Sequence, residues 1–264
     1  MDNLIDLDKL REIVYKGVRR TAVFMGLGIN AAYDESFNKY ELTDITSIQL
    51  VPSNASESEI KHFKEEFALW ITMNGFRELI ETFSIYLDSI FKICLLIKST
   101  IETIEYPEKQ INFFSKKGLE GKFTLIEEKF NIAIPYKDCI LTINKARNCL
   151  AHRRGLLGVE DCTNEKFELK WKGMELLSQN VNGETTIFDL PIPAEGYVLE
   201  KGASLCGRLG QKTISFNIGD VLRITPRDLS EICYFIMILT DEVTKEVMKF
   251  ASLNGVETID TSIK

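Results

Sequence analysis

Apolar residues recur at three- and four-residue steps over long stretches of the chain, a spacing that predicts amphipathic helices. The first stretch covers residues 4–25 and is followed by Gly26-Leu27-Gly28, where we expect the helix to end in a turn. A polar linker and a short strand over residues 46–51, ended by Pro52, are predicted next. The first part of the chain is therefore expected to hold one helix and a linker.

A long helix is predicted to begin at a capping box, in which the side chains of Ser56 and Glu59 each accept from the other's backbone N–H. The helical spacing continues to Pro107, with a kink or break expected at Asn74-Gly75. Aromatic residues at this spacing more often fill a core than stack on nucleic-acid bases, because base stacking needs exposed rings. We interpret two groups of apolar side chains as core packing: Ile60, Phe63, Phe67 and Trp70, then Phe76, Leu79, Phe83, Leu87, Ile90 and Cys94.

The spacing of apolar residues changes in the second half of the chain. Shorter helices are predicted over residues 119–130 and 136–155. Beyond that point apolar and polar residues alternate, as over residues 167–171 and 214–218, which predicts strands. Asn182-Gly183 lies between candidate strands and predicts a hairpin turn.

Helical spacing returns after Thr225, an N-cap followed by proline at the first helical position. The fold class we predict is mainly α, a helical bundle with a β-rich insertion before the last helix. A chain of 264 residues with 45% hydrophobic content can bury a substantial core, as one domain or one domain with an insertion. We divide it into an N-terminal helix and linker packing on the bundle (1–55), the bundle itself (56–155), the insertion (156–224) and a C-terminal helix that completes the bundle (225–264).

The helix predicted over residues 136–155 carries Lys145-Ala146-Arg147-Asn148-Cys149-Leu150-Ala151-His152-Arg153-Arg154, which sets one of only two histidines among three arginines. Imidazole moves protons near neutral pH, and guanidinium groups hold phosphate oxygens in a bidentate geometry. This combination suggests phosphate-ester chemistry. Asn148 and His152 lie one turn apart on one face, whereas Arg147 and His152 point in different directions. A second copy of the helix would supply the missing half, so we expect a homodimer.

The spacing of Arg147, Asn148 and His152 resembles the Arg-x4-6-His signature of the HEPN superfamily (higher eukaryotes and prokaryotes nucleotide-binding domains), which often has a polar residue directly after the arginine. The resemblance implies an α-helical bundle that dimerises so that two motifs face one another. It also implies a metal-independent ribonuclease of a toxin, phage-defence or RNA-processing system. The bundle-like part covers residues 56–154 and 225–254, and the stretch between them departs from a minimal HEPN domain.

Under this hypothesis His152 acts as general base on the ribose 2′-hydroxyl of RNA, and a His152 from either chain returns a proton to the leaving oxygen. Arg147 stabilises the charge that develops on the phosphate, and Asn148 orients His152 or the phosphate. No cofactor is expected. No metal site is evident either, because two distant histidines and scattered cysteines offer zinc no set of ligands.

Lys145, Arg153 and Arg154 complete a local basic cluster that we expect to bind the substrate, although a solvated helix end has the same composition. The net charge of −7 argues against a general nucleic-acid coat but permits such a local site. Two alternatives stay open. In one, the pocket binds a nucleotide or RNA without cutting it and serves a regulatory role; in the other, Arg147 pairs with a carboxylate, His152 caps a helix end and the dimer is a scaffold. The expected partners are RNA, a second copy and an antitoxin or nucleotidyltransferase.

Six cysteines show no paired spacing and most lie in apolar patterns, which predicts reduced, mostly buried thiols of a cytosolic protein. Cys149, inside the motif, is interpreted as a packed thiol rather than a nucleophile. Acidic residues stand at the N-terminus where a basic leader would be expected, so no secretory signal is predicted. The apolar runs over residues 85–104 and 232–239 are interrupted by charges or too short to cross a bilayer, which favours core helices. We therefore expect a cytoplasmic protein without membrane contact.

Overall fold

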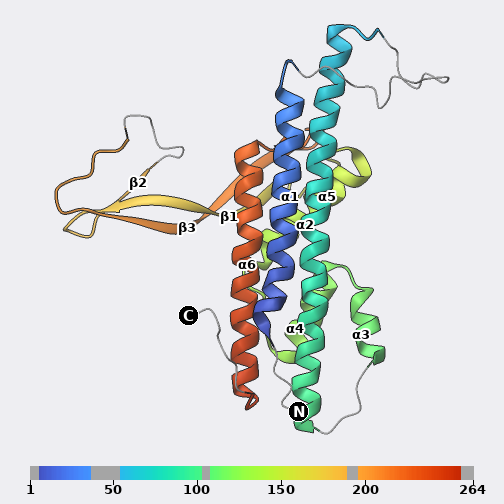
Figure 1. The fold of residues 1–264 in the computed structure, drawn as a ribbon, viewed down its shortest axis with the longest axis vertical. Helices are drawn as coiled ribbons and strands as arrows, with labels where there is room; N and C mark the ends of the chain where they lie inside the picture. The colour runs from blue at the N-terminus through green and yellow to red at the C-terminus, as the bar shows by residue number, and fades with distance from the viewer. Residues whose placement is uncertain (1–5, 37–53, 103–107, 189–195, 257–264) are drawn as a thin grey trace.

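The computed structural model describes residues 6–36, 54–102, 108–188 and 196–256. Helices dominate these residues and one small antiparallel sheet accompanies them, so the predicted mainly α class is confirmed (Figure 1). In chain order the elements are α1 (Leu7–Tyr33), α2 (Glu57–Glu102), α3 (Glu108–Ser115), α4 (Leu119–Phe130), α5 (Lys137–Arg153), β1 (Lys166–Gln179), β2 (Thr185–Phe188), β3 (Ser204–Asn217) and α6 (Pro226–Leu253). The strand expected over residues 46–51 lies outside the described residues.

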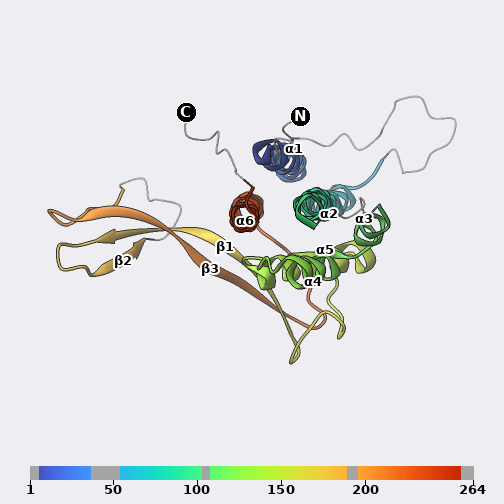
Figure 2. The same cartoon turned by 90° about the horizontal axis from the view of Figure 1, so that it is seen from below.

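The helices form layers that are visible when the bundle is seen along its long helices (Figure 2). α2 and α6 lie side by side, α1 packs on one side of this pair, and α4 and α5 lie on the other side. α5 and α6 also contact β1, whereas the far part of the strand ribbon extends away from the helices (Figures 1 and 2). None of the described helices has the combination of length and apolar sequence that a membrane span needs.

α1 is longer than predicted, because the helix continues through Gly26-Leu27-Gly28 to Tyr33. The turn expected at these glycines is therefore wrong. A Cβ built on Gly28 would lie 2.6 Å from Ile71 Cδ1 on α2. Gly28 thus allows two helices to approach each other closely and does not mark a change in chain direction. The spacing of apolar residues in the sequence does not distinguish these two roles of a glycine.

α2 begins as predicted and then runs without interruption. The Ser56 N–H donates to Glu59 Oε2 at 2.7 Å, and the Glu59 N–H donates to Ser56 Oγ at 3.4 Å, which confirms the capping box. The break expected at Asn74-Gly75 is wrong, because a Cβ on Gly75 would lie 2.7 Å from Met25 Cγ and the glycine again marks helix packing.

The two apolar groups of α2 have different surroundings. The second group is buried, as predicted, and belongs to the main core: Phe76, Leu79, Phe83, Leu87, Ile90 and Cys94. In the first group Phe67 is 36% exposed and Trp70 is 55% exposed. Their interpretation as core residues is wrong, because neither side chain belongs to the buried core cluster.

The strands predicted between residues 156 and 224 are present. β1 lies between β2 and β3, and its register with β3 is unbroken from Lys166↔Asn217 to Gln179↔Ser204. The predicted hairpin turn joins β1 to β2, with Gly183 at a φ of 84° that favours glycine. The near half of β1 is part of the bundle core, since Trp171 is 2% exposed and its Nε1 donates to Glu231 Oε2 of α6 at 3.1 Å.

α6 closes the bundle against α1 and α2. It begins as predicted at Thr225, whose hydroxyl oxygen accepts from the Asp228 N–H at 3.2 Å. The Tyr15 hydroxyl of α1 donates to Asp241 Oδ1 at 2.6 Å. The Tyr86 hydroxyl of α2 is buried and lies 2.7 Å from Thr244 Oγ1. Polar contacts therefore fix the register of α6 against both helices.

Candidate active site

The motif lies on the last three turns of α5, which is held on two sides. Its apolar side chains point into the core: Cys139, Ile140, Ile143, Ala146, Cys149 and Leu150. On the side of the sheet, Thr142 Oγ1 accepts from the Lys170 N–H of β1 at 2.9 Å. The helix ends at Arg154 and Gly155, both at positive φ, and the Gly155 N–H donates to the Cys149 carbonyl at 3.2 Å. Core packing and this cap fix the direction of the motif side chains.

The three residues of the Arg-x4-6-His resemblance lie on the outer side of α5. Arg147 and Asn148 are half-buried, and His152, one turn after Asn148, is exposed. The Nε of Arg147 is buried and has no hydrogen-bond partner within the described residues, nor does any described carboxylate form an ion pair with its guanidinium. Because an arginine that is partly desolvated without a counter-ion is costly, this group is suited to receiving an anion.

α5 does not bring Arg147 and His152 together within one chain. The helix is continuous over both residues, so their side chains leave it in directions about 140° apart. Asn148 lies on the His152 side, and Asn144, whose Oδ1 is also buried without a partner in the described part of the chain, lies between Asn148 and Arg147. One chain therefore presents the His152 imidazole and the Arg147 guanidinium in directions about 140° apart around α5.

The flanking cations differ in what they contact. Lys145 and Arg154 are exposed. Arg153 instead pairs with Asp161 and, through Nη1, with Glu160 Oε1 at 3.0 Å. Asp161 is 7% exposed and also accepts from the Gly158 N–H at 3.0 Å. Arg153 thus fastens the loop that follows α5 onto the end of the helix.

Asp161 carries no pattern in the sequence that predicted its place in the candidate site. The available signal was the adjacent pair of carboxylates at 160 and 161, one to two turns beyond a run of arginines, which is a common arrangement for a local ion pair. The number and spacing of the charges do not show which of the arginines these carboxylates pair with. In the structure both carboxylates pair with Arg153, and Arg154 is exposed.

Cys149 is a packed thiol, as predicted. Its side chain is fully buried, and its Sγ donates to the Leu156 carbonyl at 3.3 Å. Burial raises the pKa of the Cys149 thiol to about 11, so it stays protonated at neutral pH and is a poor nucleophile. The other cysteines are also free thiols, and four of the six are buried.

Within the described residues, no three His, Cys, Asp or Glu side chains lie close enough together to hold a metal ion. The candidate site consists of the outer side of α5 and the loop that Arg153 fastens to it. No family model, no curated protein and no solved structure matches the chain.

Proposed function

We propose that the protein is a HEPN-type, metal-independent endoribonuclease that cuts RNA at a site formed by two copies of α5. The observation that carries this proposal is Arg147, half-buried with an unpartnered Nε, on the same helix end as the exposed His152. A guanidinium without a counter-ion among the described residues and an accessible imidazole are the two groups that phosphodiester cleavage needs, and in the proposal two copies of α5 bring them together. Because burial raises the pKa of the Cys149 thiol to about 11, His152 is the group of the motif suited to proton transfer near neutral pH.

In the reaction, neutral His152 accepts the proton of a ribose 2′-hydroxyl while that oxygen attacks the adjacent phosphorus. The bond from phosphorus to the 5′-oxygen breaks, and a protonated His152, from the same or the other chain, gives its proton to the leaving oxygen. The products are a 2′,3′-cyclic phosphate and a 5′-hydroxyl end. Arg147 stabilises the charge on the phosphate oxygens, and Asn148 orients His152 or the phosphate.

The proposal includes a homodimer, because Arg147 and His152 leave one helix about 140° apart. In a two-fold dimer the Arg147 of one chain and the His152 of the other face the same phosphate. Lys145 and Arg154, which are exposed, contact the flanking phosphates. A toxin or phage-defence role, with an antitoxin or nucleotidyltransferase as partner, is the biological setting that we propose for this activity.

The test is incubation of the purified protein with labelled RNA in excess chelator. We expect cleavage that leaves 5′-hydroxyl ends, and a loss of about 10²-fold or more in His152→Ala. The matched control is His62→Ala, which removes the other histidine from an exposed position of α2. Retained activity in His152→Ala, or equal loss in both variants, refutes the mechanism; binding of RNA without any cleavage favours a non-catalytic regulatory module.

A mixing experiment tests the shared site. Arg147→Ala and His152→Ala proteins are each expected to be inactive. When they are mixed and allowed to exchange subunits, each heterodimer contains one site with an intact Arg147 from one chain and an intact His152 from the other. Recovery of activity supports the shared site, and its absence under proven exchange contradicts it.

A further inference from the structure

Three consecutive residues of α2 point to three different surroundings. Leu69 Cδ1 lies 3.5 Å from the position of a Cβ built on Gly155, directly after the motif helix. Ile71 points to Gly28 of α1. Trp70 lies about 100° from each neighbour and is 55% exposed, so it occupies the open flank of α2 between α1 and the end of α5. The indole is thus about one helix diameter, roughly 10 Å, from the contact between α2 and the candidate site.

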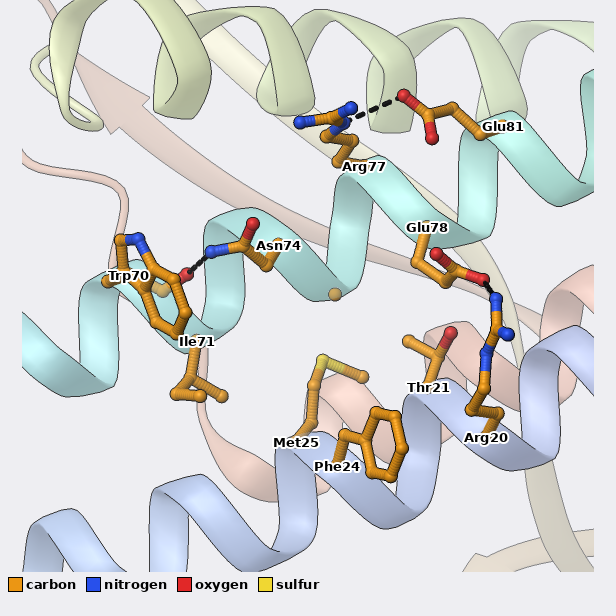
Figure 3. A pocket seen from close by; sticks show the side chains of 11 residues that line it. Arg20, Thr21, Phe24, Met25, Trp70, Ile71, Asn74, Arg77, Glu78 and Glu81 are labelled. Atoms are coloured by element: carbon orange, nitrogen blue, oxygen red, sulfur yellow. Dashed lines mark hydrogen bonds and ion pairs between the residues drawn. The ribbon is translucent and has the colours of Figure 1, made fainter.

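This flank carries aromatic rings and guanidinium groups together (Figure 3). Phe67 and Trp70 are stacked, with ring centroids 6.3 Å apart and an interplanar angle of 18°. Next to them a cavity of about 390 Å³ lies between α1 and α2, and Phe24, 60% exposed, projects at its α1 side. The cavity is also lined by Arg20 and Arg77.

The charges on the flank are balanced by weak contacts. Arg77 Nε lies 2.7 Å from Glu81 Oε1, and Arg20 pairs with Glu78. Both arginine side chains are more than half exposed, and ion pairs of this kind contribute little to stability. Each guanidinium can therefore turn to another anion at small cost. The residues that line the cavity include two arginines and two glutamates, so aromatic contact rather than net charge is what this lining offers a ligand.

Resting on the ribonuclease proposed above, we propose that Trp70 and Phe67 form a stacking platform for unpaired bases of the RNA strand that passes the end of α5. Exposed aromatic rings beside arginines bind single-stranded nucleic acid through base stacking, without reading sequence. A platform of this kind selects single-stranded RNA as the substrate, because bases in a duplex are stacked on one another and do not offer a free face. Gly155, which lies next to Leu69, is eight residues beyond Arg147, or about 12 Å counted along the helix axis, so the platform and the candidate site adjoin the same end of α5.

The first experiment measures tryptophan fluorescence on adding a single-stranded oligonucleotide whose 2′-hydroxyls are all methylated, which the enzyme cannot cut. Trp70 is exposed and the other tryptophan, Trp171, is 2% exposed, so a bound base quenches Trp70 alone. We expect partial quenching by the single strand and none by the matching duplex. Equal quenching by both, or no quenching by either, overturns the platform.

The second experiment measures the dissociation constant of the same oligonucleotide by fluorescence anisotropy. Trp70→Ala is expected to weaken binding about 5- to 150-fold, the equivalent of one stacked base, whereas Trp70→Phe retains a ring and most of the affinity. Phe113→Ala is the matched control, because Phe113 of α3 is 55% exposed and has the Lys117 ammonium 4.1 Å from its ring centroid. Equal losses in Trp70→Ala and Phe113→Ala contradict the proposal.

The two proposals fail in different ways. If cleavage depends on His152 but Trp70→Ala binds the oligonucleotide as tightly as the unaltered protein, the platform is refuted and the ribonuclease proposal stands. Quenching of Trp70 without any cleavage of ordinary RNA removes the ribonuclease and leaves a single-strand binding site. If Trp70 becomes shielded from acrylamide as the protein concentration rises without RNA, a second copy covers the flank and the platform is wrong.

Discussion

The contact between Arg153 and Asp161 gives a specific prediction about the candidate site. Asp161 is nearly buried and accepts from two donors, the Arg153 guanidinium and the Gly158 N–H. Asp161→Asn keeps the shape of the side chain but removes its charge, so the ion pair is lost, and one of the two acceptor contacts is also lost because an NH2 group replaces one carboxylate oxygen. The loop after α5 then loses its fastening to the helix end.

The expected cost follows from these contacts. A hydrogen bond to a charged group is worth about 1.5–3 kcal/mol, and the cost approaches the upper value when a buried arginine loses its counter-ion. The Arg153 side chain is 31% exposed, so we expect Asp161→Asn to destabilise the fold by about 1.5–2.5 kcal/mol. Glu160→Gln is the matched control, because it removes the 59% exposed partner of the same arginine and should cost less than about 1 kcal/mol.

Urea denaturation of both variants measures the free energy of unfolding, and RNA cleavage measures the effect on the site. We expect Asp161→Asn to lower cleavage as well as stability, because the fastened loop fixes the end of α5. Adding Arg153→Ala to each variant completes a double-mutant cycle, in which the coupling to Asp161 should exceed the coupling to Glu160. Equal coupling energies for the two carboxylates would refute the reasoning.

Further predictions concern packing, thiols and pH. The Cβ added by Gly26→Ala meets nothing within 4 Å and should stabilise α1 by up to about 1 kcal/mol, whereas that of Gly28→Ala meets Ile71 and should destabilise the fold by about 1–2 kcal/mol. Urea titrations in which both variants change the free energy of unfolding in the same direction would contradict the packing argument. Cys206 is exposed and should be alkylated by iodoacetamide well before Cys149, as peptide mapping would show. Burial raises the pKa of the Cys149 thiol in the folded state to about 11, above its ordinary value of 9.0, so the stabilisation that this thiol contributes is complete below pH 9 and is lost as pH rises toward 11, about 1.4 kcal/mol of it by pH 10. Urea titrations at pH 8 and 10 should show a smaller drop in the free energy of unfolding for Cys149→Ala than for the unaltered protein.

The sequence predicts well where local chemistry decides the structure. The capping box at Ser56 and the N-cap at Thr225 are both present, because each involves side chains only three residues from their partners. The alternation over residues 167–171 likewise predicts a strand with one buried face. The packed state of Cys149 follows from its apolar neighbours.

The sequence predicts less well where a distant element decides the structure. Gly28 and Gly75 have the composition of turns, yet each lies in a continuous helix whose partner comes close, and only the fold reveals that partner. Trp70 belongs to a regular apolar stripe, but periodicity does not show whether another element covers the stripe. α3 was not predicted, because an eight-residue helix gives too short a pattern. In the candidate site, the separate directions of Arg147 and His152 follow from helix geometry, whereas the partner of Arg153 does not.

The position of α6 has a consequence for the timing of folding. α1 and α2 complete their core only when α6 has packed against both, and α6 ends about 100 residues after the motif helix. At roughly 5–20 residues per second, a ribosome needs about 5–20 s to synthesise the residues between the end of α5 and the end of α6. During this interval α5 has been synthesised, but the layer on which it rests is incomplete. A nascent chain therefore passes its first seconds without an assembled site, and a partner that recognises the exposed surfaces of α1 and α2 has time to bind before RNA does.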